Sequence, residues 1–296
     1  MPLQLYTAPY TYRGEDRCDV TRVGVKRGDP LAFACFAPSD ALLWPALQHL
    51  DLVAALTRRA ESLTGSEAGS AVAMMALALS VKINTTYSAL YTNEMRASYR
   101  ANRAAWDAFL ARDRATIVCM CPRREPGAGQ HHTCHRAILA SILVKCGAVD
   151  CGEVGGSHEV DPHRQHRIPD MSRMVAFSGT RPPKPGTRGP QHREYELLAY
   201  RAEEVVSKLP ADAVVVHGGA AGIDKVIDDV ASVRGLTRWV VRPWWDAWGN
   251  VAPKVRNVYV AAAPKVWAFP SSYGTGTQHA CGIAREAGCE LTIVPP

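Results

Sequence analysis

The sequence contains no long uninterrupted apolar run. A membrane-spanning helix needs about 18 such residues, and no run in this chain approaches that length. The N-terminus, from Met1 to Tyr12, has neither the basic start nor the apolar stretch of a secretory signal peptide. We therefore expect a cytoplasmic protein without a membrane partner.

A strongly basic block is also missing. Residues 1–170 hold 19 Lys or Arg against 17 Asp or Glu, and residues 171–296 hold 15 against 11, so the net charge of +6 is spread along the chain. Proteins that grip nucleic acid usually concentrate positive charge on one face or arm. The mild excess suits a small anionic ligand and disfavours nucleic acid as the partner.

The nine cysteines do not form a spaced framework, so we expect reduced thiols. A length of 296 residues predicts two domains. Residues 150–172 are rich in Gly, His and Pro and lack an apolar period, which is typical of a linker. The predicted division is a domain over 1–155, a linker over 156–172 and a second domain over 173–296.

The second domain alternates short apolar runs with segments of helical spacing. The runs predict buried strands at 174–180, 213–219, 239–243, 265–271 and 290–295, and the helices fall at 192–209, 221–235, 251–262 and 277–288. Such alternation predicts an α/β fold with a Rossmann-like, doubly wound parallel sheet.

The first domain is less regular. It has candidate strands at 3–8, 20–25 and 116–121 and candidate helices at 45–63, 70–83, 93–113 and 135–147. We expect an α/β sandwich.

Three glycine-rich loops follow strands of the second domain, where an open α/β sheet places its ligand. The first is Ser178-Gly179-Thr180-Arg181, the second runs from His217 to Asp224, and the third from Phe269 to Gln278. Backbone amides at a helix start bind anions, although tight turns also use glycine for steric reasons alone. The absence of GxGxxG disfavours a dinucleotide.

This order of motifs, with Arg256-Asn257 before the third loop, resembles the SLOG superfamily. That group unites the DNA-processing protein Smf/DprA with the Lonely guy phosphoribohydrolases, and the resemblance covers nearly all of 174–296. It implies that the glycine loops and the Gly-Thr turn bind a nucleotide phosphate, with the arginine facing the same pocket. The expected ligand-binding residues are Ser178, Gly179, Thr180, Arg181, Gly218, Gly219, Asp224, Arg256, Asn257, Gly274 and Thr275.

One position departs from the phosphoribohydrolase pattern. Gln278 stands where the resemblance implies a catalytic glutamate, and an amide carries no charge to stabilise the cation formed at the sugar. Asp224, Asp246 or Glu194 could supply a carboxylate instead. Five tryptophans in this domain could stack on a base or belong to the core: Trp239, Trp244, Trp245, Trp248 and Trp267.

The first domain contains a cluster of cysteines and histidines. Cys119, Cys121, Cys134 and His135 could hold zinc, although their spacing matches no standard zinc finger. Alternatively, Cys134 at a helix start is a reactive thiolate, or the cysteines are merely buried. The segment also resembles a bacterial domain of unknown function with a strand-borne Cys and a later Cys-His-Arg, which implies no reaction.

The function expected from these features is recognition of a nucleotide or modified nucleoside phosphate by the second domain. Its processing, by glycosidic bond cleavage or base modification, would be shared with the first domain, with Gln278, Asp224 and Cys134 as catalytic candidates. A non-catalytic nucleotide sensor and a single-stranded DNA-binding protein are the alternatives, and a homo-oligomer stays open.

Overall fold

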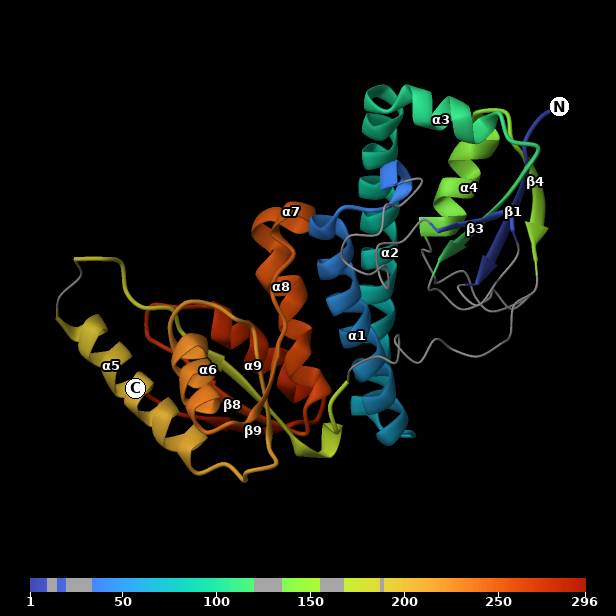
Figure 1. Cartoon of the computed structure of the whole chain (residues 1–296). Coiled ribbons are helices and arrows are strands. Elements are labelled where there is room, and N and C mark those ends of the chain that lie inside the picture. The colour runs from blue at the N-terminus through green and yellow to red at the C-terminus, as the bar shows by residue number, and fades with distance from the viewer. Residues whose placement is uncertain (10–14, 20–33, 120–134, 155–167, 187–188) are drawn as a thin grey trace. The chain divides into compact units, whose positions relative to one another are not determined.

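The computed structural model describes residues 1–9, 15–19, 34–119, 135–154, 168–186 and 189–296 (Figure 1). The chain divides into two compact units. The first comprises Met1–Ala46 and Val81–Arg167, and the second Leu47–Ser80 and Ile168–Pro296. Each unit contains one parallel sheet, which confirms the expected α/β class.

The sheet of the first unit has the order β2-β3-β1-β4. Its strands are β1 (Gln4–Pro9), β2 (Arg17–Asp19), β3 (Arg114–Cys119) and β4 (Val149–Glu153). The other elements of this unit are η1 (Ala34–Phe36), α3 (Arg103–Leu110) and α4 (His135–Lys145), and α4 packs on β1, β3 and β4. The strand expected at 20–25 lies outside the described residues.

Two long helices, α1 (Asp40–Ser62) and α2 (Glu67–Ala101), form an antiparallel hairpin (Figure 1). Sequence patterns predicted separate helices at 70–83 and 93–113, whereas α2 continues through the polar residues 84–86. The reason is a buried stripe at helical spacing, formed by Ile83, Tyr87, Tyr91 and Met95. Packing of this stripe outweighs the weak helix propensity of Asn and Thr.

Within the described residues, α2 is the one helix long and apolar enough to cross a membrane by length and composition. Core helices of soluble proteins pass the same test, so this finding assigns no location.

The second unit carries a five-stranded parallel sheet with the order β7-β6-β5-β8-β9. The strands are β5 (Met174–Gly179), β6 (Val214–His217), β7 (Thr237–Val240), β8 (Lys265–Phe269) and β9 (Glu290–Ile293). Connections leave β5 toward β7 and then return to β8 on the other side of β5. The chain therefore reverses its direction across the sheet between β5 and β8, which is where open α/β sheets bind ligands.

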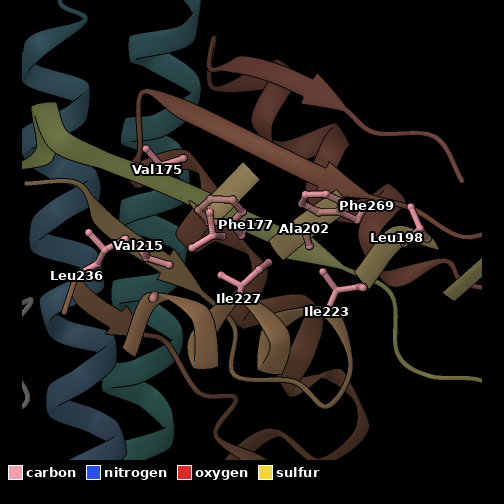
Figure 2. Close-up of a cluster of buried hydrophobic side chains, with 11 residues drawn as sticks. Val175, Phe177, Leu198, Ala202, Val215, Ile223, Ile227, Leu236 and Phe269 are labelled. Carbon is pink, nitrogen blue, oxygen red and sulfur yellow. The ribbon is translucent and has the colours of Figure 1, made fainter. Parts of the chain in front are cut away.

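Helices cover the sheet on both faces. The helical elements are η3 (Met171–Arg173), α5 (Pro190–Ser207), α6 (Ile223–Val233), α7 (Trp245–Trp248), η4 (Gly249–Val251), α8 (Ala252–Arg256), η5 (Asn257–Ala262) and α9 (Gly276–Glu286). Figure 2 shows Val175, Phe177 and Val215 of the strands packed with residues of α5 and α6. The alternate strand residues Met174 and Ala176 are also buried, so the opposite face is covered as well.

A single helix was predicted over 251–262, but the chain forms α8 followed by the 3-10 helix η5. In 3-10 geometry residues three apart lie in line. Arg256 and Tyr259 are thereby aligned, and the guanidinium carbon of Arg256 lies 5.5 Å from the Tyr259 ring centroid.

Part of the helical hairpin, Leu47–Ser80, belongs to the second unit, although the sequence assigned it to the first domain. Its Gln48 amide donates to the Val240 carbonyl and accepts from the Arg242 amide, which caps the edge of β7. The His49 ring lies 4.8 Å from that of Trp248 and 6.1 Å from that of Trp244. These two buried tryptophans are therefore core residues rather than an open stacking wall.

Candidate functional site

The three glycine-rich loops meet at the carboxyl ends of β5, β6 and β8, as the sequence predicted. Thr180 connects them: its amide donates to the Phe269 carbonyl at 3.1 Å, and its carbonyl accepts from the Ile223 amide at 3.1 Å. Its hydroxyl oxygen lies 2.7 Å from that of Ser271. Residues of all three loops thus form one site in the second unit.

Two glycines of the β6–α6 loop are required by close contacts. A Cβ atom on Gly218 would lie 1.3 Å from Nη1 of Arg256, so a larger residue would displace that guanidinium. Gly222, the N-cap of α6, has a φ of +102° and approaches the Thr180 carbonyl. Gly218 thus lets the Arg256 guanidinium approach the backbone, and Gly222 lets the Thr180 carbonyl approach it, more closely than a side chain would allow.

Asp224 and Arg256 are the two charged residues buried in this site. Their exposed fractions are 3% and 5%. Asp224 Oδ2 accepts a hydrogen bond from the Ala220 amide at 3.1 Å. Within the described part of the chain, neither Asp224 Oδ1 nor Arg256 Nε has a hydrogen-bond partner. A buried polar atom left unsatisfied costs about 1–3 kcal/mol, so these two atoms call for a functional explanation.

Burial also changes the ionisation of Asp224. Desolvation raises the pKa of its carboxyl group, although the charge of Arg256 and backbone hydrogen bonds act to lower it. The carboxyl group therefore holds a proton more readily than an exposed aspartate does. A protonated carboxyl group can donate a hydrogen bond or a proton to a ligand.

His217, which sequence reasoning did not select, supports the β6–α6 loop. Its Nδ1 accepts from the Gly219 amide at 3.1 Å, and its Nε2 lies 3.1 Å from Asp228 Oδ1. Because a backbone amide can only donate, the ring proton belongs on Nε2 and is donated to Asp228. The sequence feature that could have identified His217 is a histidine at the end of a strand, directly before Gly-Gly.

Asp228 also accepts a hydrogen bond from Arg238, whose Nη1 donates to the same Oδ1 at 3.1 Å. Partial burial alone would raise the pKa of Asp228, but the hydrogen bond from His217 and the charge and hydrogen bond of Arg238 outweigh it, and the pKa is lowered. Asp228 is therefore an ionised anchor, and its pKa is shifted in the opposite direction from that of Asp224.

The remaining predicted ligand residues occupy different settings. Ser178 and Thr180 are buried, whereas Arg181, Thr275 and Gln278 are exposed. Asn257 donates from Nδ2 to the Gly276 carbonyl at 3.3 Å, which holds the start of α9. Gly274 lies against the hydroxyls of Ser271 and Thr180, and Gly179 packs against Ile223.

Glu194 has a structural contact rather than an open position. Its carboxylate accepts from the amide and the hydroxyl of Ser272. Asp246 is exposed at the start of α7. Of the three carboxylates considered from sequence as replacements for a glutamate at 278, Asp224 is thus the buried one with an unsatisfied oxygen.

The predicted Cys/His cluster falls mostly on residues that are not described. Cys119 ends β3, and Cys121 and Cys134 lie outside the described residues. His135 begins α4 and is 6% exposed, with its ring 5.9 Å from that of Tyr91. The described residues contain no group of three or more metal-ligating side chains, so the zinc site and the reactive thiol at Cys134 stay predictions.

Comparison with known proteins found no matching family model, curated protein or solved structure.

Proposed function

We propose that the second unit binds the phosphate and sugar of a nucleotide in a Rossmann-like domain of the SLOG type. The order β7-β6-β5-β8-β9 supports this reading, because it has a switch point between β5 and β8. The three loops that follow the strands beside this point are joined through Thr180.

The observation that carries the proposal is the buried pair of Arg256 and Asp224. The Arg256 guanidinium covers the backbone of Gly218 at the start of the β6–α6 loop, and its Nε has no partner among the described residues. The N-terminus of α6 adds backbone amides and the positive end of a helix dipole. A phosphate held there satisfies the cation, and the free oxygen of Asp224 then has a sugar hydroxyl or a base as its partner.

The proposed chemistry is hydrolysis of the glycosidic bond, with Asp224 as the acid. A protonated Asp224 gives its proton to the departing base as the glycosidic bond breaks, and the oxygen of a water molecule bonds to the same sugar carbon. The proton that this water loses returns to the Asp224 carboxylate, and the products are free base and ribose 5-phosphate. The raised pKa of Asp224 favours this role. Processing with participation of the first unit remains part of the proposal.

A nucleotide sensor is the second candidate, and Gln278 favours it. The side chain is an uncharged amide in the first turn of α9, so the route implied by the phosphoribohydrolase resemblance lacks its carboxylate. Both candidates share the same binding site and differ only in product formation.

The binding proposal is tested by calorimetry on the full chain with ribonucleoside 5′-monophosphates and the matching nucleosides. We expect the monophosphates to bind more tightly, and Arg256→Gln to remove most of that difference. Arg285→Gln is the matched control, because Arg285 is an exposed arginine in the last turn of α9. Equal affinity for nucleotide and nucleoside would contradict the phosphate site.

An enzyme is distinguished from a sensor by using chromatography to measure the release of free base from the same monophosphates. Base release that Asp224→Asn abolishes without loss of binding supports hydrolysis. Binding without any product from the full chain supports the sensor.

A further inference from the structure

Three arginines from other segments approach the β6–α6 loop, Arg256 and Arg242 through their side chains and Arg181 through its backbone. Arg256 covers Gly218, as described above. Arg242, just after β7, places its Cγ 3.6 Å from the Cβ position of Gly219. The backbone of Arg181, after β5, lies 2.8 Å from the Cβ position of Gly222. Each glycine of this loop therefore has a different arginine as a neighbour.

Few negative charges balance these three cations. In the part of the chain that the structure describes, no carboxylate forms an ion pair with Arg181, Arg242 or Arg256. The nearby Asp228 is already paired with His217 and Arg238. Asp224 is the acidic residue inside the site, and burial favours its neutral form. Three arginines thus lie beside the loop with no carboxylate paired to any of them among the described residues, which leaves an excess of positive charge there.

A single phosphate does not match this excess. A phosphomonoester carries a charge of about −1.5 to −2 near neutral pH, and the α6 N-terminus adds further positive potential. The arginines also differ in setting, because Arg256 is buried while Arg242 and Arg181 are exposed. An inner phosphate at Arg256 leaves the exposed arginines free to meet a second anionic group nearer to solvent.

We propose that the ligand is a nucleoside 5′-diphosphate or a longer phosphate ester, with Arg242 as the residue that selects the second phosphate. This inference rests on the proposed function, since it uses the same site. The two arginines have separate tasks: Arg256 binds the phosphate next to the sugar, and Arg242 contacts the following one.

The test is calorimetry on the full chain with the four ribonucleoside monophosphates and the four diphosphates at fixed ionic strength. We expect the best diphosphate to bind about tenfold or more tightly than its monophosphate, the size of one charge-assisted contact. Arg242→Gln should remove this preference and leave monophosphate affinity within about twofold, since it deletes only the outer contact.

Three further variants make the result decisive. Arg242→Lys keeps the charge and should retain part of the preference. Arg256→Gln should weaken both ligand classes, and Arg285→Gln neither. Thermal unfolding of every variant checks folding; the Arg242 amide that pairs with Gln48 is backbone and is kept in both substitutions.

Each alternative outcome has a distinct meaning. Equal affinity for mono- and diphosphates, or a preference that survives Arg242→Gln, overturns the second-phosphate assignment and leaves the single-phosphate site standing. Failure of both ligand classes to bind above the level of the nucleosides overturns the proposed function and this inference together.

Discussion

Two loops of the second unit have similar glycine-rich sequences but different constructions. The β6–α6 loop encloses buried charge, with Arg256 on Gly218 and Asp224 in the first turn of its helix. The β8–α9 loop is instead held by neutral hydroxyls and by Glu194, which accepts from Ser272. Buried charged side chains with unsatisfied atoms, as in the β6–α6 loop, indicate a ligand site. Polar groups that already have partners, as in the β8–α9 loop, indicate a structural role. The composition of the two loops does not reveal that difference.

The largest expected effect comes from adding one methyl group to the β6–α6 loop. Gly218→Ala should abolish nucleotide binding, because its Cβ would lie 1.3 Å from Arg256 Nη1 and force the guanidinium out. Overpacking of this kind typically lowers the free energy of unfolding by about 1–3 kcal/mol. Calorimetry and denaturant unfolding measure both quantities.

Gly276→Ala, at the first residue of α9 directly after the β8–α9 loop, is the matched control, because a Cβ there would meet nothing within 4 Å. We expect its free energy of unfolding to change by less than about 0.5 kcal/mol. Similar losses in the two variants would remove the distinction between the loops.

A second test removes the hydrogen bonds that His217 makes to the β6–α6 loop and to Asp228. His217→Leu deletes the acceptor of the Gly219 amide and the donor to Asp228. Leaving such buried groups unpaired costs about 1–3 kcal/mol each, and nucleotide affinity should fall because the loop loses its conformation. His217→Asn, which keeps an acceptor close to the amide, should recover part of the affinity. A leucine variant with full affinity would show that the histidine only fills space.

The pH dependence of stability should have opposite signs for two of the aspartates of α6, Asp224 and Asp228. Asp224 has a raised pKa in the folded protein, so its ionisation destabilises the fold as pH rises through that pKa. The unfolding free energy of Asp224→Asn should therefore increase relative to that of wild type as pH rises above the pKa of an unfolded aspartate.

Asp228 has a lowered pKa in the folded protein. Its contribution to stability is therefore present above the pKa of the unfolded state and is lost as pH falls through the pKa of the folded state. Asp228→Asn should therefore cost stability at neutral pH and less in acid. Chemical denaturation at several pH values measures both variants, and parallel curves would refute the assigned ionisation states.

The smallest effect on stability is expected at Gln278, in the first turn of α9. Its side chain is exposed, so Gln278→Glu should change the free energy of unfolding by less than about 0.5 kcal/mol. From residues 173–296 alone we expect little release of free base from nucleoside monophosphates, and any such activity should need the full chain. Gln278→Glu should restore some hydrolysis, because a carboxylate stabilises charge on the sugar. Rapid base release by the isolated wild-type domain would contradict the inferred importance of this position.

The sequence by itself determined the α/β class and the place of the glycine loops. Strands β5, β6, β8 and β9 are short apolar runs with glycine or proline after them, and local composition of that kind reports its own secondary structure. Because the ends of parallel strands share one edge of a sheet, the convergence of the loops followed from the same pattern.

Tertiary structure alone decided which side chains the loops meet. Arg256 lies 38 residues after Gly218 in the numbering, and Gln48 pairs with backbone almost 200 residues away. The continuity of α2 through its polar stretch likewise depends on the burial of Ile83, Tyr87, Tyr91 and Met95. Contacts of this kind arise from packing between distant segments, and local propensity and periodicity carry no information about them.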